Sequence, residues 1–247
     1  MSNPVLANKM LTIGVIGGSG DLATAEYYKA INKAVNDRLG GKHSAEVIIN
    51  SMDFAKSIHY VYGDLWDEGA VYIHAKAASL ERAGADFLMI VSNTWHRAAD
   101  KFMEGIKIPL LHIFDTTAAA IKEAGLRKVA LLGTKLTMAG PYAVPELAKR
   151  AGVEVIVPDE DDQDYIDRVI IDELAQMIIK PESRKGYLDI ITKLVVQGAE
   201  GIVLGCTEIP LLITQKDDPN VPMFDTLELH AKGAVAVAFG ELPLPTR

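Results

Sequence analysis

The chain has 247 residues and a formal charge of −8, and these values exclude several classes of protein. Apolar residues make up 49% and charged residues 23%, the balance of a globular protein with room for one large or two modest α/β domains. Because the chain is acidic and has no block of Lys or Arg, we expect no nucleic acid partner. No stretch has the roughly 18 consecutive apolar residues of a membrane-spanning helix, and the start lacks the apolar core of a signal peptide, so we expect no membrane association.

The chain contains one cysteine, Cys206. A single cysteine cannot form an internal disulfide, which is typical of the reducing cytoplasm, and we expect a cytoplasmic protein. The six histidines show no metal-ligand spacing, and one thiol cannot build a thiol-rich site. We therefore expect no metal.

Strands and helices are expected to alternate along the first half of the chain. Short apolar runs without alternation indicate strands buried on both faces of a parallel sheet, and stripes with helical spacing indicate the helices between them. The expected order is a strand at 11–16, a Gly-rich turn at 17–21, a helix at 24–39, a strand at 47–54 that leads into a loop, a helix at 66–83, a strand at 87–91, a short helix at 97–105 and a strand at 108–113.

The second half of the chain repeats this pattern. Its expected elements include a helix at 116–124, a strand at 128–134, a helix at 164–174, a strand at 201–205 and a final helix at 227–239. Three pairs of landmarks recur at nearly one offset, namely Gly14 and Ala130 at 116 positions, Ser92 and Cys206 at 114, and Pro109 and Pro222 at 113. This repetition predicts two copies of one α/β unit related by pseudo-twofold symmetry.

The predicted fold is therefore α/β, with two pseudosymmetric three-layer domains, mostly parallel sheets and the active site in the cleft between them. The first domain is expected to comprise 1–115 plus 228–247, because the final helix would cross back to it, and the second domain 116–227.

Two of the expected strands end abruptly in small polar residues. The strand at 87–91 leads into Ser92 and Asn93, and the strand at 201–205 leads into Cys206 and Thr207. Open α/β sheets bind ligands at the carboxyl ends of their strands. The sequence thus predicts one small substrate held between Ser92 and Cys206.

A thiol is well suited to proton transfer near neutral pH, because its reference pKa is about 8.5. Two thiols on opposite faces of a carbon–hydrogen bond, roughly 6 to 7 Å apart, would form a two-base system. A lone buried cysteine more often packs as a small hydrophobic residue. The place of Cys206 at a strand end, within Gly-Cys-Thr-Glu, favours catalysis.

The sequence resembles the aspartate/glutamate racemase family of cofactor-independent amino-acid racemases along almost its whole length. The segments that carry the resemblance are 13–18, 39–45, 52–54, 83–86, Asn93-Thr94 with His96, 108–113, 131–134 with Thr137-Met138, 204–209, and Phe224-Asp225-Thr226 with His230. The family implies a two-domain pseudosymmetric fold, a homodimer, and a two-base mechanism on a small amino-acid or dicarboxylate substrate without pyridoxal phosphate or another cofactor.

The chain departs from the family pattern in two places. Ser92 stands where typical members have the first catalytic cysteine, although some relatives have Thr there. Because a hydroxyl is a far weaker acid than a thiol, Ser92 is better suited to donate a proton or position water than to act as a base. The loop 18–24 also differs from the family pattern. This loop, with Ser19, should line the substrate pocket through backbone N–H groups near a small carboxylate, and it lacks the spacing of a nucleotide site.

The remaining site residues have supporting roles. We expect Asn93, Thr94 and Thr207 to hold the α-carboxylate and stabilise the charge that develops on deprotonation. Thr134 is a further candidate for substrate binding. Arg168 is a candidate for binding a distal carboxylate, or alternatively a surface cation paired with Asp164 or Asp172. Glu208 and His230 are candidates for tuning Cys206. His96 and Trp95 are expected to pack the following helix.

Three functions remain open from the sequence. The first is an amino-acid racemase of the aspartate/glutamate type, with Cys206 as thiol base and acid and Ser92 on the opposite face of Cα. The second is a single-cysteine decarboxylase of the same superfamily, of the arylmalonate type. The third is a catalytically silent protein that binds an amino acid or a dicarboxylate.

Overall fold

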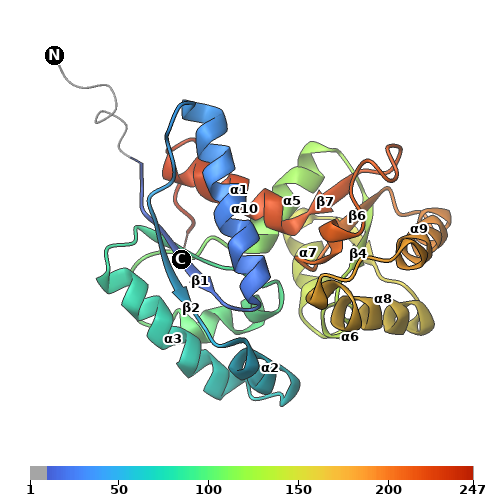
Figure 1. Cartoon of the computed structure of the whole chain (residues 1–247), viewed down its shortest axis with the longest axis horizontal. Helices are drawn as coiled ribbons and strands as arrows, with labels where there is room; N and C mark the ends of the chain where they lie inside the picture. The colour runs from blue at the N-terminus through green and yellow to red at the C-terminus, as the bar shows by residue number, and fades with distance from the viewer. Residues whose placement is uncertain (1–9, 247) are drawn as a thin grey trace. The chain divides into compact units, whose positions relative to one another are not determined.

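The computed structural model describes residues 10–246 (Figure 1). These residues form two compact units. The first unit comprises the described chain up to Val91, then Ala98–His112 and the chain from His230 onward, and the second comprises Ser92–Arg97 and Ile113–Leu229. The segment Ser92–Arg97 thus belongs to the second unit, whereas the boundaries expected above assigned it to the first domain.

The first unit contains a parallel sheet of three strands in the order β2-β1-β3. The strands are β1 (Ile13–Gly17), β2 (Val47–Ser51) and β3 (Phe87–Ile90). Both β1 and β3 are buried along their whole length, as expected for central strands without polar alternation. The parallel arrangement confirms the predicted fold class for this half.

Three longer helices belong wholly or partly to the first unit. They are α1 (Asp21–Leu39), α3 (Trp66–Arg82) and the later part of α10 (Thr226–Ala238). The first half of α1 contacts α10 at His230, where the Tyr27 hydroxyl bonds His230 Nδ1 at 3.1 Å. At the other end of α1, Arg38 forms an ion pair with Glu241 just beyond α10. These contacts hold the C-terminal segment to the first unit.

The expected strand at 47–54 is too long at its carboxyl end. The strand ends at Ser51, and Phe54 begins the helix α2 (Phe54–Tyr62). Asp53 causes the change of conformation, because its carboxylate accepts the Ala55 N–H at 3.1 Å as an N-cap.

The expected strand at 108–113 is reduced to a single parallel bridge between Leu88 and Leu110. The Leu88 N–H donates to the carbonyl of Pro109, and the Leu111 N–H donates to the carbonyl of Leu88, both at 2.8 Å. Pro109 has no N–H to extend the ladder. Ile113 already begins the helix α5 (Ile113–Glu123), so the apolar residue that completed the predicted strand is helical instead. The expected short helix at 97–105 is likewise a 3₁₀ turn η2 (Thr94–Ala98) followed by α4 (Ala99–Phe102).

The second unit contains a parallel sheet of four strands in the order β5-β4-β6-β7. The strands are β4 (Lys128–Leu132), β5 (Glu154–Ile156), β6 (Gly201–Leu204) and β7 (Met223–Asp225). Helices cover both faces of this sheet, and they are α5, α6 (Lys135–Ala139), α7 (Ala143–Ala151), α8 (Glu160–Asp172) and α9 (Pro181–Val196).

Alternation along β4 divides the core of the second unit into two layers. Val129 and Leu131 pack in one cluster with residues of α5 and α7, whereas Ala130 and Leu132 pack in another with residues of α6, α8 and α9. Successive side chains of a strand point to opposite faces, so one apolar run supplies both clusters. The second unit is therefore a three-layer α/β sandwich, as predicted.

Each of the two sheets contains a hydrogen bond that is equivalent to one in the other. In the first unit the Leu88 N–H donates to Pro109 O, and in the second the Ile202 N–H donates to Pro222 O, each at 2.8 Å. Leu88 pairs with β1 in the same way as Ile202 pairs with β4. Ser92 follows Leu88 by four residues and Cys206 follows Ile202 by four, so they occupy equivalent positions in their two halves. The internal repeat predicted from the landmark pairs is thus visible in the register.

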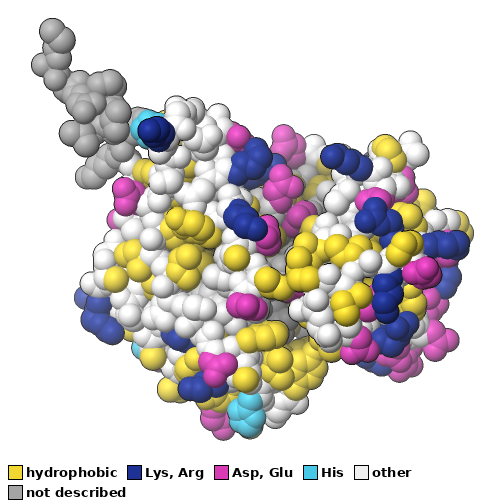
Figure 2. Space-filling view, viewed as in Figure 1, with side chains coloured by type: hydrophobic (Ala, Val, Ile, Leu, Met, Phe, Trp, Pro, Cys, Tyr) yellow, Lys and Arg dark blue, Asp and Glu magenta, His cyan; other side chains and the backbone are white. Residues whose placement is uncertain are grey.

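The surface carries charges of both signs. On the face shown in Figure 2, the described Lys and Arg side chains lie among Asp and Glu side chains rather than in a broad basic area. None of the helices within residues 10–246 is long and apolar enough to cross a membrane. Some apolar side chains are exposed, among them Phe54, Ile58 and Tyr62 on α2.

Candidate active site

Cys206 lies immediately after β6, at the carboxyl edge of the second sheet. Gly205 precedes it and donates its N–H to Leu132 O at 2.6 Å, which keeps the end of β6 against β4. A Cβ at position 205 would lie 2.9 Å from the backbone oxygen of Leu132, which cannot easily move, so glycine favours this close approach. The strand end thereby fixes the backbone that carries the thiol, and Cys206 itself remains partly exposed.

The thiol of Cys206 donates a hydrogen bond to a carboxylate. Its Sγ lies 3.0 Å from Glu208 Oε2, and the hydroxyl of Thr207 donates to the same oxygen at 2.7 Å. Burial raises the pKa of the Cys206 thiol well above its ordinary value, and the negative charge of Glu208 raises it further. The thiol is therefore protonated in the resting protein, with a proton acceptor in direct contact.

Two further groups, Asp167 and Tyr187, interact electrostatically with the same thiol. Asp167, on α8, adds a further negative charge that raises the pKa of Cys206. Tyr187, on α9, is fully buried and donates its hydroxyl to Ile166 O at 3.1 Å. Burial raises the pKa of Tyr187, and its interaction with Cys206 adds to that effect. The charges of Glu208 and Asp167 thus both disfavour a negative charge on sulfur.

Ser92 is buried at the end of the segment that follows β3. Its hydroxyl oxygen accepts the N–H of Trp95, the second residue of the short η2 turn, at 3.4 Å. A backbone N–H directed at the oxygen reduces its basicity and favours a role as proton donor over that of a base.

Within the second unit, two consecutive hydrogen bonds connect the segment that follows β3 with the end of β6. The amide nitrogen of Asn93 donates to the Thr226 hydroxyl at 3.1 Å, and this hydroxyl donates to Leu204 O at 2.9 Å. Asn93 is the neighbour of Ser92, and Leu204 precedes Cys206 by two residues. The two segments that sequence analysis paired are therefore connected through one buried threonine.

The same two hydrogen bonds leave one polar atom of Asn93 without a partner. Because the Thr226 hydrogen points to a carbonyl, its oxygen must accept from Asn93, and only the amide nitrogen can donate. Asn93 Oδ1 is then a buried acceptor without a hydrogen-bond partner, in a side chain that is 5% exposed. Such an atom indicates a missing donor.

The structure places the other predicted residues as follows. Thr134 caps α6 through the Thr137 N–H at 3.3 Å, at the carboxyl end of β4. Ser19 lies in the first unit, in the loop after β1, and accepts from the Ser57 hydroxyl at 3.3 Å. Thr94 begins η2.

Arg168 lies on α8 and is about half exposed, with 54% of its side chain accessible. Its guanidinium is 5.1 Å from the centre of the Tyr165 ring and 3.9 Å from Glu173 Oε1. It pairs with Glu173, whereas the alternative considered from the sequence was Asp164 or Asp172.

His230 belongs to the first unit and is fully buried. Its Nδ1 accepts from Tyr27, and its Nε2 donates to Leu111 O at 3.0 Å. Burial lowers the pKa of His230 to about 4, so the ring is neutral at neutral pH. Both ring nitrogens are engaged in these bonds, and tuning of Cys206 by His230 stays a prediction.

Sequence reasoning missed Thr226 and Asp167. Thr226 follows β7 at the same carboxyl edge as Cys206, and this position was the available signal. Asp167 had no such signal, because its influence on Cys206 depends on how α8 packs. In the described part of the chain, no three His, Cys, Asp or Glu side chains come together in a group that could hold a metal.

A family model described as Asp/Glu/Hydantoin racemase matches residues 13–234. The chain belongs to this family, which confirms the resemblance found from the sequence. Its fold, two repeated α/β units with parallel sheets, is that of its solved relatives.

Three relatives illustrate the match. A crystal structure of an Asp/Glu racemase candidate from Yersinia pestis is 41% identical, covers 93% of this chain and 99% of that chain, and has a TM-score of 0.87. PH1733, an aspartate racemase homologue from Pyrococcus horikoshii, is 32% identical over 93% of this chain and 99% of that chain, with a TM-score of 0.82. The broad specificity amino-acid racemase RacX of Bacillus subtilis is 24% identical over 237 residues, 91% of this chain and 96% of that protein. Family membership supports an amino-acid racemase function for this chain.

Proposed function

We propose that the protein is an amino-acid racemase of the aspartate/glutamate type, which works without pyridoxal phosphate. Cys206 removes or returns the α-proton on one face of the substrate, and Ser92 acts on the other. The observation that carries the proposal is the contact between the Cys206 thiol and Glu208, because it pairs a proton-transfer group with an acceptor at a strand end.

The first step needs a thiolate, although the resting thiol is protonated. The proton of Cys206 passes to Glu208, and the sulfur then takes the α-proton and leaves a carbanion stabilised as an enediolate on the substrate carboxylate. Thr94 and backbone N–H groups are the proposed donors to that carboxylate. The expected role of Thr207 is limited to its backbone N–H, because its hydroxyl hydrogen already goes to Glu208 Oε2. The N–H of Glu208 favours the thiolate, since it lowers the pKa of Cys206.

The second step delivers a proton to the opposite face. The hydroxyl of Ser92 gives its proton to Cα, and the product has inverted configuration. Solvent then returns a proton to Ser92, while Cys206 and Glu208 together lose one to solvent, so the protein ends as it began. A hydroxyl held by the Trp95 N–H supports this direction of transfer.

Asn93 is proposed to bind the substrate through its unpartnered oxygen. An acceptor needs a donor, and the α-ammonium group of an amino acid supplies up to three N–H donors. This assignment changes the expected role of Asn93, because its N–H group is committed to Thr226 and only its carbonyl oxygen remains for a ligand. A positive ammonium group also offsets the negative charges around Cys206. Ser19, Thr134 and Arg168 remain proposed substrate contacts.

The experiment is α-proton exchange in deuterated water, followed by NMR on L- and D-aspartate and L- and D-glutamate, with chirality read from the same samples. Exchange with inversion that disappears in Cys206→Ala supports the proposal. Exchange of the L-form without inversion would refute the role of Ser92. No exchange with any of the four substrates, together with measurable binding, would indicate a silent binding protein.

A second candidate function is decarboxylation by a single cysteine, as in the arylmalonate type. The observation in its favour is that Cys206 rests as a protonated thiol, which is the form that would protonate an enediolate after carbon dioxide leaves. A malonate carries no ammonium donor for Asn93, which favours the racemase. Release of carbon dioxide from an arylmalonate, with no exchange of amino-acid α-protons, would reverse this preference.

A further inference from the structure

We infer that His96 is a positioning residue that aims the Ser92 hydroxyl for protonation of the substrate. This inference rests on the proposed function, in which Ser92 delivers the second proton. His96 does not serve as an acid or base itself, because both of its ring nitrogens are used in holding the backbone.

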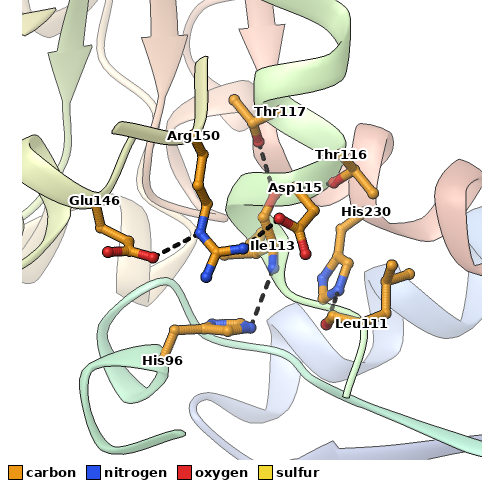
Figure 3. A network of polar contacts seen from close by, with 9 residues as sticks. All are labelled: His96, Leu111, Ile113, Asp115, Thr116, Thr117, Glu146, Arg150 and His230. Carbon is orange, nitrogen blue, oxygen red and sulfur yellow. Dashed lines mark hydrogen bonds and ion pairs between the residues drawn. The ribbon is translucent and has the colours of Figure 1, made fainter. Parts of the chain in front are cut away.

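His96 bridges two segments of the second unit. Its side chain is 1% exposed. Nδ1 lies 2.7 Å from the carbonyl oxygen of Ser92, and Nε2 lies 3.2 Å from the backbone nitrogen of Ile113, the first residue of α5. Figure 3 shows the imidazole directed at Ile113.

These two partners determine the tautomer of His96. A carbonyl oxygen can only accept, so Nδ1 carries the hydrogen, and a backbone N–H can only donate, so Nε2 provides a lone pair. The ring is therefore neutral with its hydrogen on Nδ1. A positive ring would place two donors against each other at Ile113 and would meet the positive end of the α5 dipole.

Ser92 is consequently held at two points by the same turn. Its carbonyl is fixed by His96, and its hydroxyl oxygen receives the N–H of Trp95. The position of the hydroxyl oxygen depends on the orientation of the Ser92 backbone. The bond from His96 to the Ser92 carbonyl therefore restricts where that oxygen can lie.

The anchor at the other end of His96 is rigid. The hydroxyls of Thr116 and Thr117 both bond the carbonyl of Ile113, at 2.9 and 3.0 Å. Asp115 in the first turn of α5 pairs with Arg150 of α7, which also bonds Glu146 at 2.7 Å (Figure 3). Through His96, Ser92 is thus attached to a packed pair of helices rather than to a free loop, as an accurately aimed group requires.

Two variants separate the two bonds of His96. His96→Gln keeps an amide oxygen near the position of Nε2 for Ile113 and loses the donor to Ser92. His96→Asn keeps an amide N–H near the position of Nδ1 for Ser92 and loses the bond to α5. Both are compared with the wild-type protein in the exchange assay on the L-substrate.

The measured quantity is the ratio of α-proton exchange to inversion. Cys206 controls exchange and Ser92 controls inversion, so a smaller amount of folded protein lowers both and leaves their ratio unchanged. We expect His96→Gln to raise the ratio at least about tenfold, since small misplacements of a reacting group reduce rates by that order or more. We expect His96→Asn to keep the wild-type ratio while it lowers thermal stability.

The outcomes distinguish this inference from the function on which it rests. A wild-type protein that inverts, with both variants at its ratio, would overturn the inference alone. A wild-type protein without exchange or without inversion would overturn the proposed function and the inference with it. Nitrogen-15 NMR of the histidines gives a second test, which uses the wild-type protein and does not depend on the folding of a variant. Hydrogen on Nδ1 of His96 is the expected result, and hydrogen on Nε2 would refute the inference.

Discussion

Replacement of Glu208 by glutamine should make Cys206 more reactive. Glu208 Oε2 lies 3.0 Å from Cys206 Sγ, and its charge raises the pKa of the thiol. Glutamine keeps an oxygen to accept the thiol hydrogen and removes only the charge. The change therefore isolates the electrostatic part of the contact.

Coulomb's law gives a lower limit for the decrease in the pKa of Cys206 that Glu208→Gln should cause. Two unit charges 3.0 Å apart in bulk water interact by about 1.4 kcal/mol, and by about 5.5 kcal/mol at an effective dielectric constant of 20. Because both side chains are partly exposed, the smaller value is the safer one. It corresponds to about a tenfold larger thiolate fraction at neutral pH. A less basic thiolate is also a weaker nucleophile, so we expect alkylation at pH 7.5 to accelerate about threefold to fourfold.

The assay uses the fact that Cys206 is the only cysteine in the chain. Alkylation by iodoacetamide, followed by mass spectrometry between pH 6 and 10.5, reports this thiol without interference. Thiolate absorbance near 240 nm gives the titration directly and does not depend on nucleophilicity. Glu182→Gln, an exposed glutamate in the first turn of α9, is the matched control for loss of one negative charge.

Equal titration curves for Glu208→Gln and the wild-type protein would refute this reasoning. A curve that shifts equally in Glu182→Gln would attribute the effect to net charge rather than to the contact. Slower alkylation together with an unchanged curve would indicate that Glu208 controls access to the thiol instead of its ionisation.

Three further predictions concern other residues. Gly18 has φ of 90° and an added Cβ would lie 2.1 Å from Met52 O, whereas Gly84 has φ of 95° and open space. In urea unfolding, Gly84→Ala should lower the free energy of unfolding by about 1 to 2 kcal/mol, and Gly18→Ala by about 1 to 3 kcal/mol more; equal losses would contradict the role of the close approach. The pKa of His230 is lowered from 6.5 to about 4, so its contribution to stability is present above pH 6.5 and is lost as the pH falls towards 4. Between pH 7 and 4 the wild-type protein should lose about 3 kcal/mol more than His230→Gln, and parallel curves would show that folding does not lower the pKa of His230. Arg168→Gln should raise KM for aspartate and glutamate at least about tenfold, with no change for a neutral amino acid and a stability loss below about 1 kcal/mol; equal effects on all substrates would exclude contact with a distal carboxylate.

Much of the scaffold could be predicted from the sequence because it depends on local patterns. Unbroken apolar runs marked the central strands, and three landmark pairs at nearly one offset revealed the repeat that the equivalent bonds at Pro109 and Pro222 now display. The errors occurred where one residue changed the conformation of an apolar stretch. Asp53 caps a helix where a strand was expected to continue, and Ile113 begins α5 where a strand was expected to end.

The sequence alone showed that Ser92 and Cys206 are equivalent positions at strand ends, and it predicted that Gly-Cys-Thr-Glu carries the reactive thiol. It did so because strand register and residue identity are local properties that repeat along the chain. Which polar atoms are already used in hydrogen bonds within the protein became clear from the tertiary structure alone. The amide nitrogen of Asn93 donates to Thr226, 133 positions away, and its oxygen has no hydrogen-bond partner. Nε2 of His230 donates to the carbonyl of Leu111, 119 positions away. Hydrogen bonds between residues so far apart depend on packing, which no pattern of neighbouring residues specifies.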